Sequence, residues 1–241
     1  NTFITHLNMV ALNESLVSNT TLYVNGELTM HARQHIRILA NATTQGDVFA
    51  IADTDCSGHG LFKIGNDSRI MTNNHQMTLR TNDIALYGHI QTDLQRLKIS
   101  TCLGISMDIG GEGNGRSPFR MQQSELQLLI ATNVTITSPS ANVTVYKTIA
   151  SDTAKVVGFF KFNAGDTLHH FESNTFKSVI AVAPTTIIAK DLLVNVHEGS
   201  MDIKSELYNI AAGTHIASMF ADVRLRSQSG VMKMFLESPA T

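Results

Sequence analysis

The chain has 241 residues, of which 43% are hydrophobic and 16% are charged, and its formal net charge is -2. This hydrophobic fraction argues against a disordered chain, and the charges form no long run of one sign, so we expect no nucleic-acid partner and no binding to anionic lipid. No apolar run reaches the ~18 residues that a transmembrane helix needs, so we expect no membrane span.

The composition favours a thin, repetitive β structure. The chain has no Trp, only four Pro and few aromatic residues, whereas a compact globule of this length usually uses more aromatic side chains in its core. It begins at Asn1 without a Met or a signal peptide and ends at Thr241 within a β-like pattern. We interpret it as a processed chain or a segment of a longer one, with one continuous domain over 1–241.

Short strands with period-2 alternation follow one another along the chain, separated by Gly- and Asn-containing corners. The alternating apolar pairs are, in chain order, Leu22 and Val24, Leu28 and Met30, Met77 and Leu79, Ile84 and Leu86, Val134 and Ile136, Val143 and Val145, Val194 and Val196, and Met201 and Ile203. The best helical candidate, Ser124 to Ala131, is barely two turns long. We therefore expect little or no helix.

An internal repeat supports a coiled architecture. When Asp191–Glu206 is aligned with Asp222–Glu237 without gaps, an Asp, a Gly, a Met and a Glu coincide, and most alternating apolar positions match. This pattern predicts an all-β fold, a parallel β-helix (β-solenoid) of about 8–12 coils. The alternative is an antiparallel sandwich. Because a solenoid exposes strand edges at its ends, we expect the chain to continue or to stack on a neighbour.

Two features suggest the secretory route. The first is a set of N-glycosylation sequons. Their asparagines are Asn13, Asn19, Asn41, Asn66, Asn133 and Asn142. The alternative explanation is an Asn- and Thr-rich surface that matches the motif by chance.

The second feature is a single pair of cysteines, Cys56 and Cys102, which is a candidate disulfide. Cysteines 46 residues apart would lie about two coils, or nearly 10 Å, from each other, whereas a disulfide needs Cα atoms within about 7 Å. A long loop between them would remove this obstacle, so both outcomes stay open.

Residues 60–92 contain short motifs of a known family. Thr72, Asn73 and Asn74 form one corner, and Asn82-Asp83-Ile84 is followed by Leu86 and Gly88. This stretch resembles the repeats of filamentous haemagglutinin-like β-helical proteins, and so do residues 105–136. The resemblance implies a right-handed β-helix with an extracellular fibrous or adhesive role.

The sharpest catalytic candidate lies in residues 53–70, where three of the four motifs of polygalacturonase-like hydrolases are echoed. The echoing residues are Asp53, Asp55, His59 and Arg69. Such chemistry needs carboxylates that flank a glycosidic bond, but residues 35–38, one coil away, contain no Asp-Asp pair. We therefore expect a polar corner and no enzyme, with a β-helical glycoside hydrolase as the alternative.

Other candidate sites have structural explanations that we prefer. Asp53, Asp55 and Gly58 resemble a small calcium loop but lack a downstream Glu ligand. The ten histidines suggest no metal site: His169 and His170 should face opposite sides of a strand, and dispersed surface histidines are expected. The glycine-rich segment 108–115 is expected to be a loop. We assign no catalytic, cofactor or metal residue.

The sequence thus predicts a structural segment of a secreted filament or adhesin that acts through self-association or contact with neighbouring filament subunits, carrying N-linked glycans. The alternative function is a polysaccharide-binding or polysaccharide-cleaving β-helix.

Overall fold

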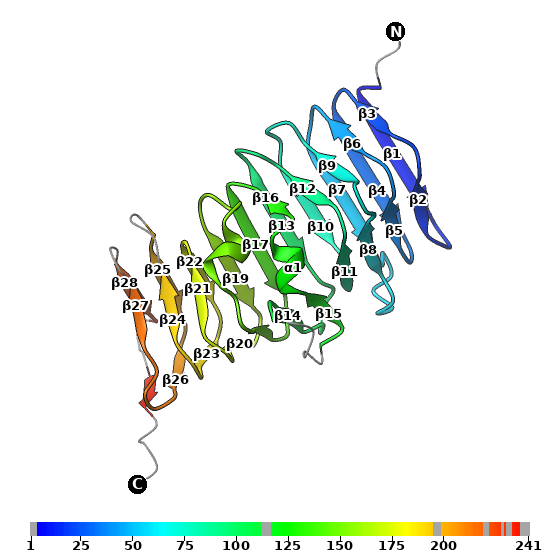
Figure 1. Cartoon of the computed structure of the whole chain (residues 1–241). Coiled ribbons are helices and arrows are strands. Elements are labelled where there is room, and N and C mark those ends of the chain that lie inside the picture. Colours follow the sequence, from blue (N-terminus) through cyan, green and yellow to red (C-terminus); the bar gives the residue numbers. More distant parts are fainter. Residues whose placement is uncertain are drawn as a thin grey trace.

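The computed structural model describes residues 4–111, 117–194, 199–218, 222–227, 229 and 233–236. These residues form a β-solenoid of about ten coils, with one short α-helix and one 3-10 turn (Figure 1). The predicted solenoid with little helix is confirmed. The strands pair in parallel, so the antiparallel sandwich is wrong. No helix among the described residues is long and apolar enough to cross a membrane.

Each coil contributes to three faces, which we name A, B and C in the order in which the chain meets them. Face A is one ten-stranded sheet. Its strands are, along the axis, β1 (His6–Ala11), β4 (Glu27–Ala32), β7 (Val48–Ala52), β10 (Met77–Arg80), β13 (Arg96–Ser100), β17 (Asn133–Ser138), β19 (Phe160–Ala164), β22 (Val179–Val182), β25 (Met201–Lys204) and β28 (Val223–Arg226).

Face B consists of a four-stranded sheet followed along the axis by a seven-stranded sheet. The first contains β2 (Leu16–Ser18), β5 (Ile36–Ile38), β8 (Leu61–Ile64) and β11 (Asp83–Leu86). The second contains, in axial order, β15 (Phe119–Met121), β14 (Met107–Ile109), β18 (Val143–Val145), β20 (Thr167–His170), β23 (Thr185–Ile188), β26 (Leu207–Ile210) and β29 (Lys233–Leu236).

Face C is also divided into two sheets. The first contains β3 (Leu22–Val24), β6 (Ala42–Thr44), β9 (Arg69–Met71), β12 (His89–Gln91) and β16 (Leu129–Ile130). The second contains β21 (Asn174–Phe176), β24 (Leu192–Val194) and β27 (Ile216–Ser218). The helix α1 (Gln123–Leu126) lies between faces B and C, and the 3-10 turn η1 (Ala150–Thr153) lies between the two sheets of face C.

The core is a set of in-register ladders of side chains that point inward. In β4 every second residue is buried, and Leu28 lies next to Val48, which lies next to Met77. Such ladders run through the coils and bury aliphatic side chains completely. The burial of a side chain of this size contributes about 1.5–3 kcal/mol relative to its exposure. Repetition of this small contribution along the axis stabilises the rod.

The corners after face C explain the Thr-Asn-Asn motif. Thr44, Thr72 and Thr92 are buried one above another, and the hydroxyl of each donates to a backbone carbonyl of its own turn. Asn73 and Asn74 follow with φ of 46° and 67°, a left-handed conformation that asparagine tolerates better than most residues. The motif is thus an inward hydrogen-bonded Thr followed by a tight turn.

Two details of the sequence analysis are wrong. Helix α1 spans only Gln123–Leu126, because Leu129 and Ile130 already belong to strand β16. The gapless alignment of Asp191 with Asp222 places β24 of face C against β28 of face A, whereas the structure pairs Met201 with Val223. Alternating apolar residues occur on every face, so the alignment matched different faces of the coil.

Candidate functional site

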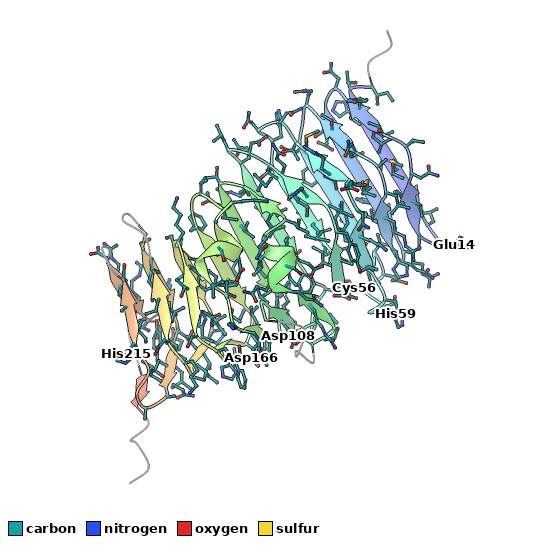
Figure 2. All side chains as sticks on the ribbon, viewed as in Figure 1. Glu14, Cys56, His59, Asp108, Asp166 and His215 are labelled. Carbon is teal, nitrogen blue, oxygen red and sulfur yellow. A yellow bond between two sulfur atoms is a disulfide. The ribbon has the colours of Figure 1, made fainter. Side chains whose placement is uncertain are left out.

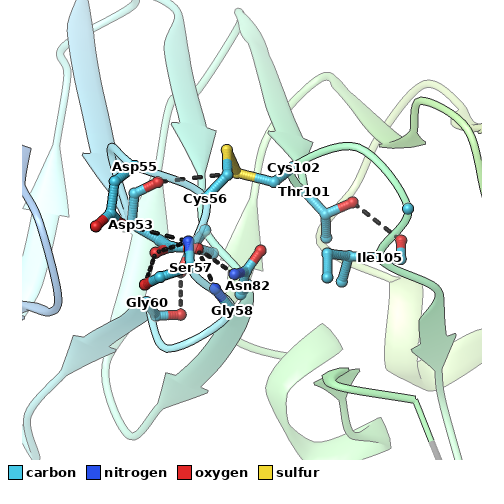
Figure 3. The surroundings of a disulfide bond; sticks show 12 residues. Asp53, Asp55, Cys56, Ser57, Gly58, Gly60, Asn82, Thr101, Cys102 and Ile105 are labelled. Atoms are coloured by element: carbon cyan, nitrogen blue, oxygen red, sulfur yellow. Dashed lines mark hydrogen bonds between the residues drawn. A yellow bond between two sulfur atoms is a disulfide. The ribbon is translucent and has the colours of Figure 1, made fainter.

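A polar excursion leaves the solenoid after β7, and Figure 2 labels Cys56 and His59 on it at one edge of the rod. The buried carboxylate of Asp53 organises this loop. Its Oδ1 accepts from the backbone N–H and the hydroxyl of Ser57, both at 2.9 Å, and its Oδ2 accepts from the Gly58 N–H at 3.0 Å and from Asn82 Nδ2. Because both oxygens are fully engaged, Asp53 acts as a structural acceptor (Figure 3).

The excursion also carries the disulfide between Cys56 and Cys102 (Figure 3). Cys56 follows β7 and Cys102 follows β13, two strands further along face A. The eight residues 53–60 reach across the intervening coil and bring the two Cα atoms to 5.7 Å. The loop therefore brings the two cysteines closer than the distance between two coils, and the disulfide forms.

The residues of the hydrolase hypothesis do not converge on a cleft. Asp55 accepts from Arg33 Nε at 2.7 Å, and this hydrogen bond is the main reason that the pKa of Asp55 is lowered to about 2. His59 is exposed, and no hydrogen bond in the described part of the chain joins it to Asp53 or Asp55. The backbone N–H of Arg69 donates a hydrogen bond to Asn41 Oδ1. The structure does bring Asp53 and Asp55 together, since both accept from the Ser57 N–H, at 2.9 and 3.3 Å, but no described hydrogen bond adds His59 to this pair.

Metal binding has no support there either, because the described residues contain no group of three or more His, Cys, Asp or Glu side chains placed to hold an ion. The glycine-rich segment is partly a strand: 108 and 109 end β14, Gly110 and Gly111 turn with φ of 81° and 65°, and residues 112–116 lie outside the described chain.

Three sequon asparagines have a structural task. Asn41, Asn133 and Asn142 each directly precede or begin a strand, and each Oδ1 accepts the backbone N–H of the equivalent residue one coil later. The distances are 3.1, 3.1 and 3.2 Å to Arg69, Phe159 and Thr167. We call these asparagines register caps, because each one ties two coils in register.

The same contact is made by side chains outside sequons. His35 Nδ1, Asp47 Oδ1 and Asp191 Oδ1 accept in the same way from Leu61, Gln76 and His215. The other three sequon asparagines, Asn13, Asn19 and Asn66, lie exposed on corners, and none of the described hydrogen bonds involves their side chains. The six candidates thus fall into two classes by their side-chain hydrogen bonds and not by their exposure, because the register cap Asn142 is also exposed.

The expectation of dispersed surface histidines is wrong for His170. His169 and His170 do face opposite sides of β20, but His170 points inward and is completely buried. It lies between Val145 and Ile188, and neither ring nitrogen has a hydrogen-bond partner in the described chain. Burial lowers the pKa of His170 to about 3, so its ring is neutral at ordinary pH.

Between β13 and β16 the chain places helix α1 and two strands of face B, β14 and β15, where the sequence analysis identified no site. Strands β14 and β15 pair with each other, and β15 lies beside β11 on face B. Glu125 joins this seam: its Oε1 accepts from the Leu86 N–H and its Oε2 from the Gln122 N–H, both at 2.7 Å. Burial raises the pKa of Glu125, and both of its oxygens serve the backbone.

A shallow hollow of about 270 Å³ opens beside α1. Its lining residues are Gly111, Gln122, Gln123, Ser124 and Gln127. Gln123 Nε2 and Gln127 Nε2 donate to the two oxygens of the buried Asp152 at 2.8 and 2.9 Å. The sequence signal for this hollow is the group of three glutamines Gln122, Gln123 and Gln127.

No family model matches the chain, and no curated protein and no solved structure matches it. The functional argument therefore depends on the fold and on the geometry of these residues.

Proposed function

We propose that the chain is a structural β-solenoid segment of an extracellular filament or adhesin, which acts through the assembly of its coils and not through catalysis. The observation that carries this proposal is the uncovered edge of β1. Within the described residues, no strand pairs with β1 on the side away from β4. Leu7, Met9 and Ala11 are only partly buried, whereas the equivalent residues of β4 are fully buried.

This edge offers both parts of a strand-addition site. The outer backbone groups of β1 are available for a further parallel strand, and the inward side chains offer an apolar ladder for it to cover. The resemblance to filamentous haemagglutinin-like repeats supports a fibrous or adhesive role for such a stack.

The extracellular part of the proposal is supported by the disulfide, because structural disulfides persist in oxidising compartments. Exposed Asn13, Asn19 and Asn66 are suited to carry N-linked glycans, which would keep the rod soluble between its ends. Glycopeptide mass spectrometry after secretion from a eukaryotic host should find sugar at these three sites.

Light scattering and electron microscopy of the purified chain test assembly. We expect rods or concentration-dependent oligomers that Met9→Lys abolishes, because the introduced ammonium would be buried in the stack. Val10→Lys, on the outward side of the same strand, is the matched control and should leave assembly intact. A wild-type chain that stays monomeric at every concentration would sink the proposal.

The alternative, a polysaccharide-binding solenoid, is favoured by one observation, the glutamine-lined hollow beside α1.

A further inference from the structure

The hollow lies on the corner between faces B and C, where one residue follows each strand of face B. In axial order this row contains Tyr87, Gln122, Gly110, Tyr146 and Phe171. From Gln122 to Phe171, neighbouring members follow paired strands and are about one strand spacing, ~4.8 Å, apart, whereas Tyr87 follows β11, which ends the other sheet of face B. Tyr146 and Phe171 therefore follow the lining residue Gln122 along the axis, on the far side of Gly110.

The described residues that line the hollow are polar and uncharged. Each of Gln123 and Gln127 has one N–H fixed by Asp152, which is itself buried and also accepts the Ile149 N–H at 2.8 Å. The two amide oxygens make no described hydrogen bond, so they are held in place as acceptors, and each amide keeps a second N–H. Side chains held in this way lose little freedom when they bind a ligand.

Aromatic side chains continue the hollow along the axis. The rings of Tyr146 and Phe171 are 5.6 Å apart, and His169 meets Phe171 edge-on at 5.4 Å. Phe171 is 49% exposed, although a phenylalanine side chain is more usually buried. Gly111 connects the two parts: a Cβ added to it would lie 3.0 Å from Tyr146 Cβ, so glycine lets the tyrosine reach the edge of the hollow.

We propose that this hollow and the Tyr146–Phe171 pair together bind a neutral glycan chain that runs along the corner of the solenoid. Planar amide groups donate to and accept from adjacent hydroxyls, and aromatic faces cover the apolar side of a sugar ring. The hollow is smaller than the ~300–1,000 Å³ of an enclosed ligand pocket, which suits one unit of a polymer lying across it.

The charge of the site selects against other ligands. Among the described residues, the lining offers no cation for a phosphate or carboxylate and no free carboxylate for an amine, since both oxygens of Asp152 are engaged. Lys147 is exposed next to Tyr146, so an acidic glycan is the competing ligand that the test must address. The inference rests on the adhesive half of the proposed function, because it names the ligand that an adhesin would need.

Isothermal titration calorimetry on the whole chain tests the site, with cellohexaose and mannohexaose as neutral probes and hexagalacturonate as the acidic probe. Two variants remove one group each from exposed positions, Gln122→Ala and Phe171→Ala. Loss of one hydrogen bond or one ring contact should weaken binding at least about fivefold. Tyr23→Ala, which removes a 74% exposed tyrosine from face C, is the matched control and should bind like the wild type.

Binding of at least one neutral probe that both variants weaken and the control preserves supports the site. Three results overturn it: no neutral probe binds at millimolar concentration, the variants bind as well as the wild type, or only hexagalacturonate binds. Melting temperatures of the variants show whether they fold, and Gln122→Ala truncates a solvent-exposed side chain. Assembly is tested separately at β1. If the chain assembles but binds no glycan, the proposed glycan site is wrong and the proposed structural function stands.

Discussion

Replacement of His170 by leucine should make the solenoid more resistant to acid. In the folded chain His170 is neutral, buried among aliphatic residues, and has a pKa of about 3, whereas its ordinary value is 6.5. The unfolded chain therefore binds a proton below pH 6.5 that the folded chain rejects, so stability falls as the pH is lowered from 6.5 toward 3.

The size of this effect follows from the two pKa values. One pKa unit corresponds to about 1.4 kcal/mol, so at pH 5, which is 1.5 units below the unfolded-state pKa, His170 should cost about 2 kcal/mol. Below pH 3 the cost should level off at about 5 kcal/mol. At pH 7, His170→Leu should already stabilise the fold by about 1–3 kcal/mol, because it removes a buried N–H that has no acceptor.

Urea unfolding followed by far-ultraviolet circular dichroism, at pH 7, 6 and 5, measures this difference. The wild type should lose about 2 kcal/mol more than His170→Leu between pH 7 and pH 5. His59→Gln, which changes an exposed histidine, should behave like the wild type. If His170→Leu and the wild type lose the same stability, the buried, neutral state of His170 is wrong.

Three further predictions concern the corners, and urea unfolding measures each of them. Joint replacement of Cys56 and Cys102 by serine should cost about 4 kcal/mol, from the entropy of closing a loop whose ends are 46 positions apart in the sequence; equal stability would mean that the bond does not form. Asn133→Ala should cost about 1 kcal/mol through loss of its register cap, while Asn19→Ala should change stability by less than about 0.5 kcal/mol. Asp53→Asn should cost about 2–4 kcal/mol, because an amide NH2 group would replace a carboxylate oxygen that accepts hydrogen bonds from two donors. An unchanged midpoint of urea unfolding would contradict the role of Asp53 as a structural acceptor.

The fold could be predicted because alternation in each short strand defines its inward residues. The register could not, because the coils differ in length: Phe160 lies next to Val179, 19 residues on, whereas Leu97 lies next to Val134, 37 residues on. A fixed period does not exist, so a gapless alignment matched different faces.

Alternation could have placed the buried histidine, but it does not encode the contacts on which the hollow depends. Strand periodicity showed that His169 and His170 face opposite sides, and the inward Leu168, two positions before His170, is the signal that could have placed His170 in the core. The hollow depends on Gln123 meeting Asp152, 29 residues away in the next coil, and on an insertion whose length no local signal reveals.

The register caps change what the sequons mean. In Asn133-Val134-Thr135 the asparagine caps the next coil, the valine faces the core and the threonine faces outward. A capping Asn, an inward apolar residue and an outward β-branched residue together give Asn-X-Thr, so strand entry in a parallel solenoid produces sequons without any selection for glycans. The sequon count therefore overstates the support for secretion. The proposed secretion is supported by the smaller set of exposed asparagines that make no register contact, Asn13, Asn19 and Asn66, together with a disulfide that an excursion of eight residues reaches across a coil to form.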